Sequence, residues 1–333
     1  MELSSKIYVA GHTGLVGSAL VTRLRDSGYQ NLILRTHREL DLTDQAKVER
    51  FFSEMCPDYV FLAAAQVGGI FANSSQPAPF IFENLRIETN VIHESYRCSV
   101  NRLLFLGSSC IYPRLAAQPL REESLLTGSL EATNRPYAVA KIAGVEMCWA
   151  YNRQYRTRFL AVMPTNLYGP GDNYDPDTSH LVPALIRKMH EAKLSNTQEV
   201  AVWGTGTPRR ELLYSEDAAD ACIFLMQRPD TEIDFFLSSE ESPPLFNVGF
   251  GVDLTVAEVA ACVAEAVGYG GSLIFDLTKP DGTPQKLLDT SRLSSLGWRA
   301  TTTLHHGLAQ TYQEFCSRLF ERSEDVALSS REG

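Results

Sequence analysis

A tyrosine and a lysine four residues apart, Tyr137 and Lys141, have the spacing and the chemistry of a proton-transfer pair. Pro136 suits the first turn of a helix, so the two side chains are expected on one helical face. A lysine ammonium beside a phenol favours the phenolate and lowers the pKa of the tyrosine from its ordinary value of about 10. Such a tyrosine exchanges a proton with a carbonyl or alcohol oxygen near neutral pH. Alone, the pair is equally compatible with a surface coincidence, so it needs support from other residues.

A predicted strand end supplies part of that support. The apolar run 103–106 predicts a buried parallel strand. The residues that follow it directly are Gly107, Ser108, Ser109 and Cys110. In open α/β folds, ligands bind at the carboxyl edge of the sheet. Two hydroxyl groups and a thiol are therefore expected where a reactive tyrosine could work beside them.

A glycine-rich turn near the N-terminus points to a nucleotide. The strand candidate 6–10 runs into Gly11-His12-Thr13-Gly14-Leu15-Val16-Gly17, and helical spacing follows up to Gly28. Glycines let the backbone pass close to a pyrophosphate, which then lies at a helix N-terminus with free N–H donors. Strand, glycine turn and helix in this order predict a dinucleotide site, with a turn that binds no ligand as the alternative.

The end of the second predicted strand, 32–34, indicates which dinucleotide binds. It carries Arg35, His37 and Arg38. An NAD site usually has Asp or Glu at this position, which accepts a hydrogen bond from the adenosine ribose. A 2′-phosphate instead requires positive charge, so the sequence favours NADP(H). An exposed basic turn is the alternative, because surface arginine is common.

Strand and helix patterns alternate along the first half of the chain, which predicts an α/β fold with a doubly wound parallel sheet. We divide the chain into a Rossmann domain, 1–165, with returning segments near 211–250, and a smaller α/β substrate-binding domain, 166–333. Strands are expected at 6–10, 32–34, 59–63, 103–106, 159–163, 200–204, 245–248 and 273–275. Helices are expected after 15 and at 45–55, 80–98, 137–155, 180–192, 215–227, 255–267 and 303–321, with 73–79 read as a loop.

Composition restricts the partners. With a net charge of −10, 44% hydrophobic and 21% charged residues, the 333-residue chain is not expected to bind nucleic acid or an anionic membrane. No apolar run reaches the roughly 18 residues of a membrane span, and the N-terminus leaves no room for a signal peptide. Seven dispersed cysteines without a metal-ligand spacing predict reduced, mostly buried thiols in a cytoplasmic protein, and no metal site.

These motifs together resemble those of the extended short-chain dehydrogenase/reductase family. The segments that carry the resemblance are 11–17, 63–70, 106–113, 136–141, 163–170 and 279–284, and the likeness extends to about Phe315. The Ser-Ser-Cys and Lys-Pro-Asp-Gly segments are the most specific, and they resemble the branch that acts on GDP-4-keto-6-deoxymannose. The resemblance implies epimerisation of that sugar at C3 and C5, followed by reduction at C4 with NADPH. It also implies a homodimer formed through helices of the main domain.

The resemblance assigns roles by position. Tyr137 would donate a proton to the C4 oxygen, Lys141 would hold the nicotinamide ribose, and Ser108 would polarise the keto group. Cys110 and His180 would act as base and acid on opposite faces of the sugar. The substrate residues implied are Lys188, Trp203, Arg210, Lys279 and Asp281. The cofactor residues implied are Gly11, His12, Thr13, Gly14, Leu15, Val16, Gly17, Arg35, His37, Arg38, Asp41, Leu42, Ala63, Ala64, Ala65, Leu106, Gly107, Ser108, Ser109, Tyr137, Lys141, Pro164, Thr165, Asn166, Leu167 and His180.

Two positions depart from the family pattern. Bacterial members often carry arginine where Thr13 and His37 stand, which bears on the preference for NADP over NAD, and Arg38 could compensate. A 4-epimerase or 4,6-dehydratase of the same fold is one alternative, although a dehydratase would be expected to have carboxylates beside the serine. A protein that senses NADP without catalysis is another, and it predicts a broken Ser–Tyr–Lys set.

Overall fold

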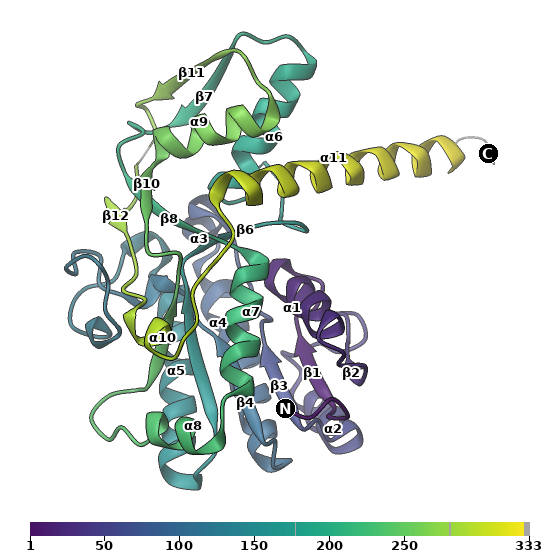
Figure 1. Cartoon of the computed structure of the whole chain (residues 1–333), viewed down its shortest axis with the longest axis vertical. Coiled ribbons are helices and arrows are strands. Elements are labelled where there is room, and N and C mark those ends of the chain that lie inside the picture. The colour runs from purple at the N-terminus through teal and green to yellow at the C-terminus, as the bar shows by residue number, and fades with distance from the viewer. Residues whose placement is uncertain (177, 280, 330–333) are drawn as a thin grey trace.

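The computed structural model describes residues 1–176, 178–279 and 281–329, except for the side chains at 70, 71 and 321–329. Its central sheet contains β1 (Ile7–Ala10), β2 (Leu32–Ile33), β3 (Tyr59–Leu62), β4 (Arg102–Leu106), β5 (Phe159–Pro164) and β9 (Leu245–Val248). All six strands pair in parallel, in the order β2-β1-β3-β4-β5-β9 (Figure 1). The predicted doubly wound parallel sheet is confirmed.

Helices cover both faces of this sheet. They are α1 (Leu15–Asp26), α2 (Gln45–Met55), α3 (Ile70–Ser75), α4 (Pro77–Arg97), α5 (Arg135–Tyr155), α7 (Ser215–Gln227) and α8 (Asp230–Leu237). Leu104 and Leu106 face the core that includes α1 and α7, whereas Leu103 and Phe105 face the core that includes α2, α4 and α5. Successive strand side chains point to opposite faces, so each strand contributes to both cores.

The strand order creates a place for a ligand. β1 lies between β2 and β3, so the connections that follow β1 and β2 leave in opposite directions. In such a sheet, ligands bind outside the carboxyl ends of the strands at this switch point. The glycine turn after β1 and the small residues after β3 lie at that point, and the Gly107–Cys110 segment follows the adjacent β4.

Most of the remaining elements form a smaller part at the carboxyl edge of the sheet (Figure 1). β8 (Arg209–Tyr214) pairs with β6 (Asn166–Tyr168), β10 (Asp253–Thr255) and β12 (Gln285–Lys286). A separate pair is formed by β7 (Glu199–Trp203) and β11 (Ser272–Asp276). The helices of this part are α6 (Leu181–Leu194), α9 (Val256–Val267) and α11 (Leu304–Ser329). α10 (Ser291–Ser295) instead packs beside β9 of the central sheet, and the short 3-10 turns η1 (Ser109–Ile111), η2 (Glu122–Ser124) and η3 (Ala132–Asn134) lie between β4 and α5 in the chain.

Differences from the expected elements have local causes. The segment 73–79, expected as a loop, contains the end of α3 and the start of α4. Pro77 occupies the first turn of α4, where a missing N–H costs nothing. The last helix was expected to end near 321, but it extends to Ser329. Thr255 and Glu258 form the reciprocal hydrogen bonds of a capping box at the start of α9, as predicted.

Two predictions about the whole chain concerned its cysteines and its membrane-spanning segments. All seven cysteines are free, but only Cys148 and Cys222 are buried, so the prediction that most of them are buried is wrong. Cys56 is exposed because it lies in a turn at the end of α2. Within the described part of the chain, no helix combines the length and the apolar character that crossing a membrane requires.

Candidate active site

The glycine turn forms a tight cradle at the switch point. Gly11 has a φ of +82°, and a Cβ at this position would lie 2.7 Å from the backbone nitrogen of Ala64. A Cβ on Gly17 would overlap the carbonyl oxygen of Gly11. The N-terminus of α1 has no side-chain cap, so its first N–H groups face the cleft without one. His12 Nδ1 is buried and has no hydrogen-bond partner among the described residues, so this cradle is suited to a polar ligand such as a pyrophosphate.

The basic side chains that follow β2 differ in exposure and in whether neighbouring residues already contact them. Arg35 is half-buried, donates to the carbonyl oxygen of Leu34 at 2.8 Å, and lies over the Phe51 ring at 5.9 Å from its centroid. His37 and Arg38 are exposed. Arg35 is therefore already engaged by its own neighbours, and Arg38 is the cation best placed by exposure to meet a phosphate.

Ser108, Cys110 and Tyr137 meet at the end of β4. Ser108 accepts a hydrogen bond from the backbone N–H of Cys110 at 3.3 Å, which fixes the first turn of η1. Burial raises the pKa of Tyr137 well above 10.0, the charges of Cys110 and Glu88 raise it further, and a hydrogen bond with Ser108 acts in the opposite direction. The phenol is therefore a protonated group that can donate to an oxygen.

This result corrects the sequence-based expectation for Lys141. Its Nζ lies 5.9 Å from the centroid of the Tyr137 ring, so the two side chains are neighbours as predicted. However, Nζ donates to the carbonyl oxygen of Leu106 at 3.0 Å and lies 3.1 Å from the Glu88 carboxylate. The prediction of a lowered Tyr137 pKa is wrong, because burial disfavours the phenolate and the charges of Cys110 and Glu88 raise the pKa further.

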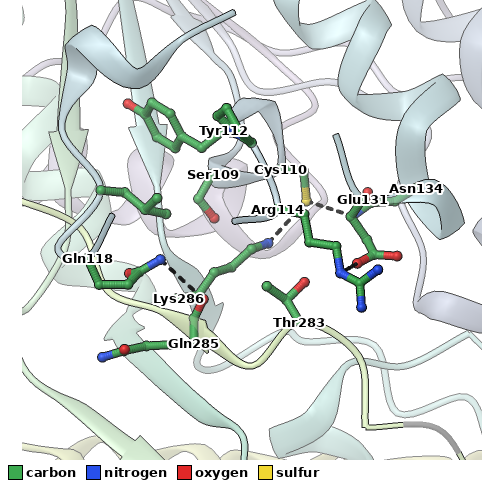
Figure 2. Close-up of a pocket in the computed structure, with 12 residues that line it drawn as sticks. Ser109, Cys110, Tyr112, Arg114, Gln118, Glu131, Asn134, Thr283, Gln285 and Lys286 are labelled. Atoms are coloured by element: carbon green, nitrogen blue, oxygen red, sulfur yellow. Dashed lines mark hydrogen bonds and ion pairs between the residues drawn. The ribbon is translucent and has the colours of Figure 1, made fainter. Parts of the chain in front are cut away.

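The Cys110 thiol lies among polar side chains, which Figure 2 shows. Asn134 Nδ2 and Lys286 Nζ donate to its sulfur at 3.1 Å and 3.4 Å. The pocket beside them has a volume of about 10 Å³, enough for about one water molecule and far too small for a nucleotide-sugar. Both donors therefore contact the sulfur that the resemblance assigns to proton removal.

His180 lies at the start of α6, as its N-cap residue. Desolvation by the surrounding protein lowers the pKa of its imidazole from 6.5, and the Lys286 ammonium lowers it further. The imidazole is therefore predominantly neutral at physiological pH. Lys286 thus acts electrostatically on both residues that the resemblance assigns to epimerisation, Cys110 by direct contact and His180 through its charge.

A second cluster of cations surrounds Trp203 in the smaller part of the molecule. Lys188 and Lys279 each lie 5.3 Å from the centroid of its ring, which is 52% exposed. Burial lowers the pKa of Lys188, the charge of Asp276 acts against this shift and that of Lys279 adds to it. An exposed aromatic face between two ammonium groups is suited to a base and its phosphates.

Arg210 and Asp281 lie next to this cluster. Arg210 donates to the carbonyl oxygen of Asp281 at 3.4 Å, and burial lowers the pKa of the arginine. The Asp281 carboxylate accepts hydrogen bonds from the backbone and the hydroxyl of Thr205 at 2.7 Å and 2.9 Å. The five predicted substrate residues therefore fall into two adjoining groups. Pro280, part of the motif quoted from the sequence, lies outside the described residues.

Comparison with known proteins assigns the family. The sequence model of the NAD dependent epimerase/dehydratase family matches residues 7–249. The chain belongs to this family. It is 54% identical over 324 residues to "Putative GDP-L-fucose synthase 2" of Arabidopsis thaliana, covering 97% of the chain and 95% of that protein. It is 51% identical over 313 residues to GDP-L-fucose synthase of Escherichia coli (strain K12), covering 93% and 96%.

A solved structure from the NAD dependent epimerase/dehydratase fold is also close. The structure of a GDP-D-glycero-L-gluco-heptose synthase from Campylobacter jejuni, determined in the presence of NADPH, superposes with a TM-score of 0.88 at 40% identity. The match covers 95% of this chain and 99% of that one. The predicted membership of a family of nucleotide-sugar enzymes built on a dinucleotide-binding sheet is confirmed.

The other predicted cofactor residues lie along the same sheet edge. Ala63–Ala65 follow β3, Leu106 ends β4, and the segment 107–109 follows it. Thr165, between β5 and β6, and Asn166, the first residue of β6, both donate to the carbonyl oxygen of Glu211, at 3.2 Å and 2.9 Å. Asp41 accepts from the backbone and hydroxyl of Thr43 at 2.9 Å and 2.8 Å, and Leu42 is buried. Their contacts to a ligand stay predictions.

Sequence reasoning missed three residues that contact the predicted site residues Cys110 and Lys141. Asn134 and Lys286 contact Cys110, and Glu88 contacts Lys141. Lys286 comes two residues after the Lys-Pro-Asp-Gly-Thr-Pro motif, so its position in the sequence was a usable signal. Glu88 lies on the buried face of α4 with Asn84 and Ile92, where helical periodicity calls for an apolar residue, and that mismatch was a second signal.

Proposed function

We propose that the chain is a GDP-L-fucose synthase, which epimerises GDP-4-keto-6-deoxymannose at C3 and C5 and then reduces C4 with NADPH. The observation that carries this proposal is the Cys110 thiol, held by Lys286 at 3.4 Å, beside the protonated phenol of Tyr137. A thiol suits removal of a carbon-bound proton, and a phenol suits protonation of an alkoxide. One site therefore holds the groups for both reactions. The relatives named GDP-L-fucose synthase, which are 54% and 51% identical to this chain, support the same activity.

For epimerisation, Cys110 is the base and His180 is the acid on the opposite face of the sugar. The keto group at C4 acidifies the protons on its neighbouring carbons, and hydrogen bonds to the developing oxyanion stabilise the enolate. Ser108 supplies such a hydrogen bond. Because its lowered pKa leaves the imidazole mainly neutral at rest, His180 must first take up a proton, which it then returns to carbon as a strong acid.

For reduction, Tyr137 donates its proton to the C4 oxygen. NADP(H), when bound, supplies the hydride. Lys141 holds the ribose next to the reacting ring, from a position at the end of β4 fixed by the Leu106 carbonyl oxygen at 3.0 Å. The raised pKa of Tyr137 suits this direction of reaction, since a phenol that keeps its proton is an acid and not a base.

The chain's own residues fit NADP(H). The glycine cradle, the uncapped start of α1 and the unpartnered His12 Nδ1 would receive the pyrophosphate. Arg38, with His37 and Arg35, would meet the 2′-phosphate. Exposure favours Arg38, which would offset the missing arginines at positions 13 and 37.

The GDP portion of the substrate would bind in the smaller part of the molecule. Trp203 offers an exposed ring, and Lys188 and Lys279 flank it at 5.3 Å. Arg210 would bind a diphosphate oxygen, and Asp281 would accept from a ribose or a base. The division into 1–165 and 166–333 follows these two binding roles, with β9 of the central sheet drawn from the second half.

Two further assignments belong to the same proposal. A homodimer would form through α4 and α5, where Phe82 and Tyr155 are exposed and Tyr155 stacks on Tyr96 at 4.2 Å. A cytoplasmic location would suit seven free cysteines, one of them exposed.

The test is to incubate the purified chain with NADPH and GDP-4-keto-6-deoxymannose. NADPH should be oxidised, and the product should be GDP-L-fucose. Protein that binds NADPH but leaves its absorbance unchanged with this substrate would contradict the proposal. The alternative is another NADPH-dependent GDP-sugar enzyme of the same fold, which the similarity to the Campylobacter jejuni heptose synthase favours. It predicts oxidation of NADPH with a 4-keto heptose and not with the deoxy sugar.

A further inference from the structure

Glu211 is a buried carboxylate to which the mechanism above gives no role. It lies in β8, directly after Arg210, and is 0% exposed. Its carboxylate accepts hydrogen bonds from the backbone N–H groups of Gly251 at 2.6 Å and Leu288 at 2.9 Å. Burial raises the pKa of Glu211, and these two hydrogen bonds act against the shift. Leu288 is itself buried, so its N–H would have no acceptor if the carboxylate were removed.

The chain leaves space for this carboxylate at the end of the central sheet. Gly249 directly follows β9, and a Cβ at this position would overlap the Glu211 carboxylate. Glycine is therefore required for the backbone to pass this close to it. Leu288, on the other side, comes two residues after the end of β12. The carboxylate thus joins the end of a central strand to the segment that follows β12.

The main chain of Glu211 makes a separate link to the cofactor side of the site. Its carbonyl oxygen accepts from Thr165 Oγ1 at 3.2 Å and from Asn166 Nδ2 at 2.9 Å. A substitution of the Glu211 side chain leaves this carbonyl group in place. The two links can therefore be separated by experiment, since only the side chain reaches the segment after β12.

The segment held by this carboxylate carries Lys286, whose ammonium donates to the Cys110 sulfur at 3.4 Å. β12 is only two residues long, so its pairing with β8 fixes little of the chain beyond it. The N–H of Leu287 donates to Gln118 Oε1 at 3.0 Å, and the N–H of Leu288 donates to the carboxylate on β8. These contacts hold the backbone just after Lys286, and that backbone sets the direction of its side chain.

We propose that Glu211 is a positioning residue for epimerisation: its carboxylate holds the segment after β12 so that Lys286 meets the Cys110 sulfur. This role rests on the proposed function, since it requires Cys110 to remove protons from the sugar. Glu211 acts through the backbone N–H of Leu288 and takes no part in the proton transfer itself. Without the carboxylate, the segment would shift to find another acceptor for this N–H, and the ammonium would move away from the sulfur.

The first test is deuterium wash-in at C3 and C5 in Glu211→Met. Methionine keeps the length of the side chain and offers only a weak acceptor to the two N–H groups. Wash-in should slow by about tenfold or more, as in Lys286→Met, since both substitutions remove the ammonium from the sulfur. Binding of NADPH should stay within about twofold, because the Glu211 carbonyl group and the glycine cradle are unchanged. Wash-in at the wild-type rate would overturn the proposal.

A double-mutant cycle separates this role from a structural one. If Glu211 acts through Lys286, adding Glu211→Met to Lys286→Met should slow wash-in by less than about twofold further. Two losses of about tenfold each that multiply would show that Glu211 acts independently of Lys286, against the proposal.

Asp217→Leu is the matched control for loss of stability. Asp217 is 7% exposed, and its carboxylate accepts from the backbone N–H groups of Thr301 at 3.2 Å and Thr302 at 2.9 Å. Both Asp217→Leu and Glu211→Met should unfold at lower urea concentration than wild type, since each leaves two N–H groups without their acceptor. Only Glu211→Met should lose wash-in. An equal loss of wash-in in Asp217→Leu would mean that Glu211 only maintains the fold.

Alkylation of Cys110 by iodoacetamide gives a readout that needs no substrate. Peptide mass spectrometry follows Cys110 separately, and the exposed Cys56 is the internal reference. Glu211→Met and Lys286→Met should change the rate at Cys110 in the same direction, by about threefold or more. An unchanged rate in Glu211→Met contradicts the proposal. A wild-type chain that shows neither wash-in nor NADPH oxidation with the GDP-ketosugar, while the two variants share this change, would contradict the proposed function and leave the hold of Glu211 on Lys286 standing.

Hydrogen exchange in the wild-type protein covers the case in which Glu211→Met does not fold. The N–H of Leu288 should exchange slowly, because a buried carboxylate accepts it. Exchange at the rate of an unprotected amide would show that the Glu211 carboxylate does not hold this segment, and the proposal would be wrong.

Discussion

The Lys286 ammonium lies 3.4 Å from the Cys110 sulfur, although 176 residues separate the two in the sequence. The contact exists because β12 pairs in parallel with β8 and directs Lys286 back toward the end of β4. The second half of the chain therefore supplies a cationic hydrogen-bond donor to a residue of the first half.

Removing the Cys110 thiol should separate the two reactions. Cys110→Ser should slow deuterium wash-in at C3 and C5 by about 10²–10⁴-fold, because a hydroxyl is a far weaker base than a thiolate. Binding of NADPH, followed by fluorescence, should not change. Wild-type wash-in in this variant would remove Cys110 from the mechanism.

Removing the cation beside the thiol should slow epimerisation. In Lys286→Met the Cys110 sulfur loses its cationic hydrogen-bond donor, so deuterium wash-in at C3 and C5 should slow by about tenfold or more, since a hydrogen bond to a charged group contributes about 1.5–3 kcal/mol. Lys286→Arg keeps a cationic donor and serves as the matched variant. Equal wash-in rates in all three proteins would show that Lys286 does not act on Cys110.

Tyr137→Phe should abolish reduction and spare epimerisation. NADPH oxidation should fall by about 10²–10⁴-fold, since the C4 oxygen loses its proton donor, while wash-in at C3 and C5 continues. Because the pKa of Tyr137 is raised above 10.0, wild-type kcat should show no alkaline limb from this group below that pH. NADPH oxidation by the variant at the wild-type rate would exclude Tyr137 as the donor.

The exposed ring of Trp203 should act in binding alone. Trp203→Ala should raise KM for the GDP-sugar by about tenfold and leave kcat nearly unchanged, because contacts with the nucleotide are the same in the ground and transition states. Steady-state kinetics with varied substrate measure both constants. A fall in kcat at constant KM would place Trp203 in the chemistry instead.

Asp172 should make stability depend on pH. Burial and the nearby Glu314 charge raise its pKa from 3.8 to about 7, against the effect of a hydrogen bond from Asn173. The native state therefore retains a proton that the unfolded chain releases at lower pH, so the free energy of unfolding falls as pH rises between these values. Each unit of pKa difference corresponds to about 1.4 kcal/mol.

Asp172→Asn should therefore be more stable than wild type at pH above about 7, by roughly 1–3 kcal/mol in urea unfolding. The pH-dependent difference should vanish well below the ordinary value of 3.8, where the Asp172 side chain is neutral in both the native and the unfolded states. A constant difference at every pH would contradict the assignment.

Much of the site could be predicted because its parts are local. The turn at Gly11 requires glycine for its own backbone and for contact with Ala64, and the sequence shows the glycine directly. The helix from Arg135 brings Tyr137 and Lys141 to one face through its own periodicity. α7 and β9 begin and end at the predicted residues, since apolar patterning and flanking polar residues mark their ends.

The sequence by itself determined the fold class, the nucleotide turn and the identity of the reactive side chains, because each depends on residues close together in the chain. Only the tertiary structure decided which groups surround them. Glu88 lies beside Lys141, and Lys286 beside Cys110, because separate helices and strands pack together. Burial and the charges of Cys110 and Glu88 reversed the expected shift in the pKa of Tyr137. A pKa is set by everything within a few ångströms, and spacing along the chain does not contain that information.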